Sequence, residues 1–215
     1  SKAEKVINYA FNFNYNNCKL YRNYCNSINK ENINNHKLTD IPFLPIEFFK
    51  NHKIKTDRGK TSRVFFSSGT TGKKSKHYVQ DLKVYDQSLL YSFKYVFGDP
   101  QNFHFLGITP DPSKRKNSSL IYMIDKLQKF SKNEGFFSAN FQSFKLNIEK
   151  YKNSNKKIII YGLSHLLLDF VENEKFNLKD FIIIETGGMK GNREEIEKRK
   201  LHEILSDGFG TDKVY

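Results

Sequence analysis

Residues 157–162 read Lys157-Ile158-Ile159-Ile160-Tyr161-Gly162, a run of β-branched and aromatic residues followed by a glycine. Two further apolar runs lie at 103–108 and 181–184. Continuous apolar strands are typical of parallel sheets, because helices cover both faces of such sheets. The three runs therefore predict strands of one parallel sheet, and we expect the strand that begins at Lys157 to end at Gly162.

Apolar residues with helical spacing lie between and around these predicted strands. The predicted helices cover residues 82–97, 120–127, 141–151, 165–172 and the stretch around Leu201, Ile204, Leu205 and Phe209. Asp81, Ser164 and Asn192 are the expected N-caps of three of them, and Val96 is expected on the buried face of the first. Alternating helices and strands predict an α/β fold, with a layered, mainly parallel sheet flanked by helices.

The first part of the chain reads as one or two helices over residues 3–29. Val6, Tyr9, Ala10 and Phe13 keep helical spacing there. Pro42 and Pro45 then impose an extended path. At the other end of the chain, residues 212–215 are expected to start a further strand.

A glycine-rich loop follows the strand-like run Val64-Phe65-Phe66, and it reads Ser67-Ser68-Gly69-Thr70-Thr71-Gly72-Lys73-Lys74-Ser75-Lys76. Glycines let backbone N–H groups approach an anion closely, hydroxyls add neutral donors, and lysines add charge. The Walker A pattern is excluded, because only two residues separate Gly69 from Gly72. We interpret the stretch as a phosphate-binding loop, with a plain hairpin turn to His77-Tyr78-Val79 as the alternative.

A second glycine-rich loop, Glu185-Thr186-Gly187-Gly188-Met189-Lys190-Gly191, follows the predicted strand at 181–184. Ligands of parallel α/β sheets bind at the carboxyl ends of the strands. Because both loops follow strands directly, we expect both of them at that edge of the sheet. The alternative for the second loop is an ordinary turn from a strand to a helix.

The chain has 215 residues and a formal net charge of +13. Its basic residues form small clusters at 73–76, 114–116, 156–157 and 198–200, mostly at predicted turns or on a polar helix side. This pattern favours solvated surface over the single basic face of a nucleic-acid-binding protein. No apolar run approaches the ~20 residues of a membrane span, and Ser1-Lys2-Ala3-Glu4 lacks an apolar signal region, so we expect a cytoplasmic protein.

The two cysteines, Cys18 and Cys25, are seven residues apart, which on a helix is too far for a disulfide bond. Reduced structural thiols are the favoured interpretation. No set of cysteine and histidine residues has the spacing of a zinc site, so we predict no metal ligands among the side chains.

Three stretches carry a resemblance to a known family: residues 40–50 (Asp-Ile-Pro-Phe-Leu-Pro-Ile-Glu-Phe-Phe-Lys), the loop 67–72 running into Ser75-Lys76-His77-Tyr78, and 186–191. In this order they resemble the acyl-protein synthetases of bacterial bioluminescence operons, a branch of the adenylate-forming, acyl-CoA synthetase-like superfamily. The resemblance runs from about residue 37 to the end. It implies a helical segment at 1–36 and the nucleotide-binding α/β portion of an adenylate-forming domain at 37–215.

The resemblance implies an ATP- and Mg²⁺-dependent ligase that activates a carboxylic acid, a fatty acid in this branch, as an acyl-adenylate. The acyl group then passes to a thiol of the protein, of a partner protein or of CoA. The implied phosphate-binding residues are Ser67, Ser68, Gly69, Thr70, Thr71 and Gly72, with Lys73 or Lys76 nearby. Gly187, Gly188 and Met189 would form the wall beside adenine. His165 could line the acyl pocket, although simple packing at a helix start is the alternative.

The family pattern continues beyond residue 215. A strand starting near Val214-Tyr215 leads, in the family, to an aromatic-Gly-x-Thr-Glu motif whose glutamate helps to bind the metal. That motif, a ribose-binding aspartate, the acyl-accepting cysteine and a mobile C-terminal domain are all missing from this sequence. We therefore expect an N-terminal portion of a longer enzyme, incomplete at its C-terminus. A non-catalytic fragment that acts through a partner, or a basic nucleic-acid-binding module, are the alternatives.

Overall fold

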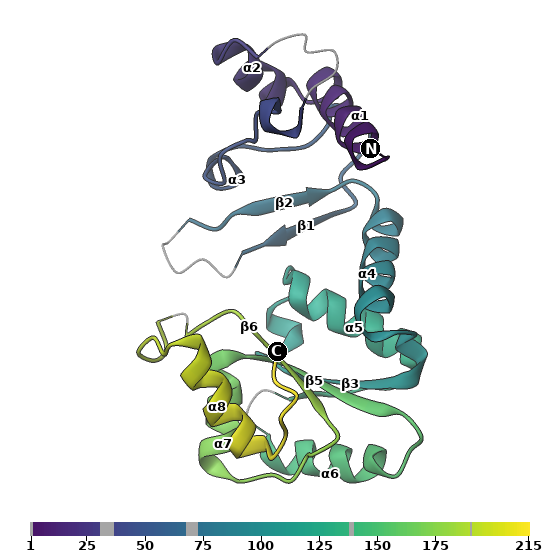
Figure 1. The fold of residues 1–215 in the computed structure, drawn as a ribbon, viewed down its shortest axis with the longest axis vertical. Helices are drawn as coiled ribbons and strands as arrows, with labels where there is room; N and C mark the ends of the chain where they lie inside the picture. Colours follow the sequence, from purple (N-terminus) through teal and green to yellow (C-terminus); the bar gives the residue numbers. More distant parts are fainter. Residues whose placement is uncertain (1, 31–36, 68–72, 138–139, 190) are drawn as a thin grey trace. The chain divides into compact units, whose positions relative to one another are not determined.

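The computed structural model describes residues 2–30, 37–67, 73–137, 140–189 and 191–215. The chain forms two compact units, Ser1–Tyr85 and Asp86–Tyr215. Each unit has its own sheet (Figure 1). The boundary that the family resemblance implies, between residues 36 and 37, stays a prediction.

The second unit is built on a four-stranded parallel sheet with the order β4-β3-β5-β6. Its strands are β3 (Phe103–Ile108), β4 (Phe136–Phe137), β5 (Lys157–Leu163) and β6 (Ile182–Thr186). Val214 forms a parallel bridge to Ile183 beside β6, where a further strand was expected to start. The expectation of a mixed α/β fold with a mainly parallel sheet is confirmed.

Helices cover both faces of this sheet (Figure 1). Phe93 and Leu127 belong to α4 (Leu82–Phe97) and α5 (Ser119–Ser131), and they pack with Ile159 and Tyr161 on one face. Ile158 and Ile160 face the opposite side, where they meet α6 (Phe141–Lys152), α7 (Ser164–Asn173) and α8 (Lys198–Phe209). Because successive side chains of a strand point to opposite faces, burial on both sides explains the uninterrupted apolar run of β5.

Several local expectations for the second unit are wrong, and each failure has a tertiary cause. Val96 is 67% exposed, although its spacing on α4 matches that of Phe93. Gly162 lies inside β5 rather than at its end, because the strand pairs with β6 through Leu163. Ser164 is the first residue of α7, and its hydroxyl donates to Glu185 instead of capping the helix.

Asn192 does not cap the last helix either. It lies in a turn in which its backbone N–H donates to the Met189 carbonyl at 3.0 Å, and α8 begins only at Lys198. The expected cap at Asp81 is confirmed, because its side chain accepts from the Lys83 N–H at 2.8 Å. The chain also has short 3₁₀ helices at Leu38–Asp40, Pro100–Asn102 and Pro112–Lys114.

The first unit contains α1 (Lys2–Asn17), α2 (Lys19–Ser27) and α3 (Phe48–Asn51). Its small core joins Phe11, Cys25 and Ile41, with Ile7 and Tyr15 packed against them. The predicted helix over the first residues is present as α1, although Val6, Tyr9 and Phe13 of its apolar spacing are exposed. Phe11 is instead the buried residue of α1, so a competing stripe at i, i+4 and i+8 is the one that packs against α2.

A two-stranded antiparallel sheet completes the first unit. It pairs β1 (Arg63–Phe66) with β2 (Lys76–Val79), in a register that sets Phe66 opposite Lys76. The expectation that both glycine-rich loops leave one parallel sheet is therefore wrong. The first loop connects the strands of a hairpin, because β1 and β2 are close enough in the chain to pair directly.

A polar cluster lies at the amino end of β3, where His104 has an unusual environment. Its Nε2 is 3.0 Å from Ser154 Oγ, and its ring stacks on Tyr151 with 4.2 Å between centroids. Burial, followed by the charges of Lys156 and Lys150, lowers the pKa of His104 to about 4. The side chain is therefore neutral in the folded protein near neutral pH.

We expect His104 to make the protein less stable in mild acid. Its pKa is lower in the folded state, so the unfolded chain binds the additional proton as the pH falls below about 6.5. Stability should therefore fall from about pH 6.5 towards pH 4, and be fully retained above that window. Screening near the sheet edge limits the loss to about 2 kcal/mol. Denaturant titrations at about pH 7 and pH 4.5 measure this loss.

A His104→Leu variant should lose about 2 kcal/mol less stability over that pH interval than the unsubstituted protein. The variant cannot titrate at this position, whereas the carboxylates of both proteins respond to acid alike. His77→Gln is the matched control, because His77 is exposed on β2. Equal acid sensitivity of the His104→Leu variant and the unsubstituted protein would contradict the assignment.

Candidate functional site

The carboxyl edge of the parallel sheet carries a buried polar cluster that joins β6, α7 and α8. The Ser164 hydroxyl, fully buried at the start of α7, donates to Oε1 of Glu185. The other carboxylate oxygen of Glu185 lies 3.7 Å from His202 Nε2 on α8, and the Glu185 side chain is only 7% exposed. The Glu185 carboxylate thus links the end of β6 to the start of α7.

The sequence interpretation missed this cluster. A usable signal was present, because Glu185 is an acidic residue placed directly after three isoleucines of a buried strand. Nothing local marks His202, which the packing of α8 against α7 brings to the same point.

The second glycine-rich loop leaves the sheet directly after this cluster. Gly187 and Gly188 have φ angles of 97° and 61°, a region that side-chain-bearing residues rarely adopt. Met189 turns inward and is 1% exposed within the apolar core. The loop thus offers glycine backbone at the surface, while the methionine side chain packs below it. Its predicted contact with adenine is not tested by the structure.

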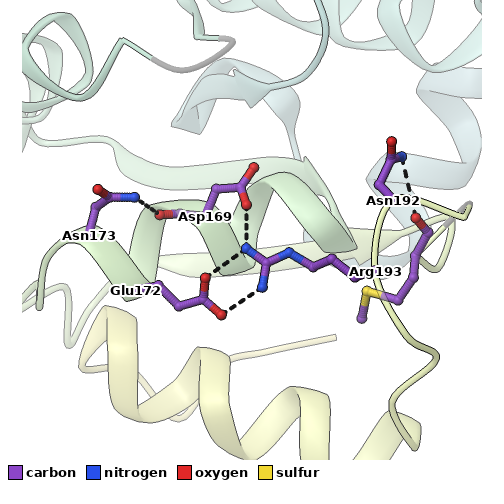
Figure 2. A network of polar contacts seen from close by, with 6 residues as sticks. Asp169, Glu172, Asn173, Asn192 and Arg193 are labelled. Carbon is purple, nitrogen blue, oxygen red and sulfur yellow. Dashed lines mark hydrogen bonds and ion pairs between the residues drawn. The ribbon is translucent and has the colours of Figure 1, made fainter.

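The chain that follows this loop is bound to α7 by Arg193 (Figure 2). Its guanidinium donates to both carboxylate oxygens of Glu172, at 2.6 and 2.7 Å, and also to Asp169. These hydrogen bonds hold the pKa of Glu172 below its usual value and raise that of Arg193. A planar guanidinium fork suits this two-pronged contact. Because Ser164 holds Glu185, the span from Glu185 to Arg193 is tied to α7 at both ends.

His165 follows Ser164 on the first turn of α7 and is half-buried. The pairing of Leu163 with Thr186 sets the end of β5 beside the end of β6. The structure therefore brings His165 and Gly187 to the same edge of one sheet, as the parallel strands predicted. A role for His165 in an acyl pocket stays a prediction.

The first glycine-rich loop belongs to the other unit, and Ser68, Gly69, Thr70, Thr71 and Gly72 lie outside the described residues. Its flanks are closed by two hydrogen bonds. The Ser67 N–H donates to the Ser75 carbonyl at 3.0 Å, and the Ser75 N–H donates to Ser67 Oγ at 2.9 Å. Lys73 donates to Asn51 Oδ1 at 3.0 Å. Lys73, Lys74 and Lys76 are exposed at this end of the hairpin.

Both cysteines are buried free thiols, as expected. Among the described residues, no three His, Cys, Asp or Glu side chains are grouped so that they could hold a metal ion. In the same part of the chain, no helix has the length and apolar character that a membrane crossing requires.

Comparison with known protein families gives a match to "Acyl-protein synthetase, LuxE" over residues 2–214. The chain belongs to the acyl-protein synthetase (LuxE) family. The LuxE match also includes the first two helices, so it extends beyond residues 37–215, on which the resemblance rested.

A curated relative of this LuxE-family chain is the "Long-chain-fatty-acid--luciferin-component ligase" of Aliivibrio fischeri. The two are 28% identical over an alignment of 228 positions, and the match covers 98% of the chain and 59% of the relative. The LuxE-family chain thus spans about three fifths of the length of this ligase.

Proposed function

We propose that this chain is the nucleotide-binding part of an adenylate-forming ligase. The ligase would activate a long-chain fatty acid with ATP and pass the acyl group to a thiol of a protein or of CoA. The family match over residues 2–214 and the name of the Aliivibrio relative support a ligase that acts on fatty acids. The adenylate step rests on the Ser67–Gly72 loop.

The observation that carries the proposal is the arrangement at the end of the β1–β2 hairpin. A hydrogen bond joins Ser67 and Ser75 at the two flanks of the loop. Lys73, Lys74 and Lys76 are exposed at the same end of the hairpin. A carboxylate and a triphosphate repel each other, so a site that unites them needs positive charge and fixed donors. The positive charge and the hydrogen-bond donors at this end of the hairpin suit the triphosphate group of a nucleoside triphosphate. Bound Mg·ATP would supply the electrophilic α-phosphorus.

The second glycine-rich loop, in the second unit, is a further candidate for contact with a nucleotide. Gly187 and Gly188 would let a flat base approach the backbone, and Arg193 would hold the loop in place through Asp169 and Glu172. The described residues form no cluster of metal ligands. In the proposal, Mg²⁺ therefore arrives with the nucleotide, and the lysines neutralise the remaining phosphate charge.

Titration calorimetry with Mg·ATP tests the phosphate-loop assignment. We expect a Thr70→Val/Thr71→Val variant to bind at least about tenfold more weakly, because two hydroxyl donors to an anion are removed. The Thr39→Val/Thr61→Val variant is the matched control, since it makes the same chemical change outside the loop. Equal ATP affinity of the two double variants, with both chains folded, would overturn the assignment.

A further inference from the structure

Positive charge is concentrated in one stretch of the first unit. Residues 50–76 contain a single acidic residue, Asp57, and nine basic ones: Lys50, Lys53, Lys55, Arg58, Lys60, Arg63, Lys73, Lys74 and Lys76. The last three adjoin the phosphate loop and have a role in the proposed function. The other six precede the loop, and the proposed reaction gives them no task.

Two of these six basic residues, Lys53 and Lys55, line a hollow of about 340 Å³ in the first unit. Its lining residues come from two segments: Lys19, Leu20 and Asn23 from the first part of α2, and Lys53, Lys55 and Asp57 from the segment before β1. The Asp57 N–H donates to the Asn17 carbonyl at 2.6 Å. This bond fixes the segment that contains Asp57 to the junction of α1 and α2.

The described part of the chain offers the three lysines of this hollow no carboxylate partner. Within the described residues, Lys19, Lys53 and Lys55 make no ion pair, and Lys53 lies over the Tyr78 ring at 5.5 Å. By contrast, the second unit pairs Lys126 with Asp86 and Lys145 with Glu174. Three lysines that line one hollow give it a positive potential, which a bound anion would neutralise.

We propose that this hollow binds a phosphorylated small molecule that carries two or more negative charges. Its volume is within the range of small-molecule sites. Lysine binds phosphate as a point charge, and the Asn23 amide can donate to a further phosphate oxygen. Leu20 offers apolar contact to an ester group. The single carboxylate, Asp57, leaves the lining with a net positive charge.

This site is separate from the phosphate loop, and it does not depend on the proposed reaction. The probe is inorganic diphosphate without Mg²⁺, titrated into the full chain at constant ionic strength. We expect saturable binding that Lys53→Gln/Lys55→Gln weakens at least about tenfold. Lys198→Gln/Lys200→Gln is the matched control, because it removes the same charge from the exposed start of α8, and its affinity should change less than about twofold.

A second variant tests the same hollow in case Lys53→Gln/Lys55→Gln impairs folding. Lys19 is exposed on α2, so Lys19→Gln should leave the thermal midpoint unchanged and still weaken diphosphate binding about threefold. In the Thr70→Val/Thr71→Val chain, in which binding at the phosphate loop is impaired, saturable diphosphate binding at the hollow should persist. In that background, ADP tests a phosphate ester against the free anion, and saturable binding of either one at the hollow supports the proposal.

Several results would overturn the proposal of an anion-binding hollow. Equal weakening in the Lys53/Lys55 and Lys198/Lys200 variants would show diffuse charge attraction instead of a site. Complete loss of saturable binding in the Thr70/Thr71 variant would place the diphosphate at the loop alone. The proposal would also fail if diphosphate did not saturate, or if an oligonucleotide or an acidic peptide bound the lysines of the hollow and diphosphate did not compete.

Discussion

A Phe144→Ala substitution is expected to lower the free energy of unfolding of the second unit by about 4 kcal/mol. Phe144 is fully buried on α6. Its ring meets Phe137, Phe170 and Phe176 edge-on, with centroids 5.4, 5.0 and 5.6 Å away. These neighbours come from β4, from α7 and from the segment after α7. Truncation would leave a cavity that three separate parts of the chain cannot jointly close.

Denaturant unfolding measures the effect of this substitution. Leu146→Ala is the matched control, since Leu146 is on the same helix but 65% exposed, and it should cost less than about 1 kcal/mol. Phe144→Leu keeps most of the volume and should cost about 1.5 kcal/mol. If Phe144→Ala lowered the free energy of unfolding no more than Leu146→Ala does, the described packing of Phe144 against its three aromatic neighbours would be contradicted.

Gly208→Ala should lower the free energy of unfolding by about 3 kcal/mol, although alanine is the better helix former. Gly208 lies in α8 where this helix crosses α7, and a Cβ atom added there would overlap the Cβ of Val171. The Val171 Cβ is fixed by the backbone of α7 and cannot rotate away. The helices would have to move apart, at the cost of the packing of Leu205 and Phe209.

The sign of this change is the critical observation. At an exposed helix position, a glycine-to-alanine substitution stabilises a protein by about 1 kcal/mol. A gain in stability in Gly208→Ala would therefore contradict the close approach of α8 to Val171 at this position. Asp207→Ala, at the exposed neighbouring position, should change stability by less than about 0.5 kcal/mol. In a double-mutant cycle, Gly208→Ala should cost about 2 kcal/mol less in a Val171→Gly background than in the unsubstituted protein, because Val171→Gly removes the overlapping atom.

The sequence by itself determined the elements whose cause is local. The predicted strand at 103–108 coincides with β3, and the helix around Phe144, Ile148 and Tyr151 buries all three residues. Asp81 was found as a cap because an aspartate before an apolar helical stripe accepts from the first-turn N–H groups. The sequence also indicated the family, because Ser67–Gly72 and Thr186–Gly191 are short contiguous motifs.

Only the tertiary structure decided which partner each surface meets. The helix α1 carries two apolar stripes, and its packing on α2 buries Phe11 and leaves Tyr9 exposed. Ser164 bonds to Glu185 rather than to its own helix, because β5 and β6 pair side by side. The contacts of Arg193 with α7 and the gathering of Lys19 with Lys55 likewise join residues more than 20 positions apart. Periodicity records how a segment folds on itself, whereas these contacts depend on long-range packing that no local pattern encodes.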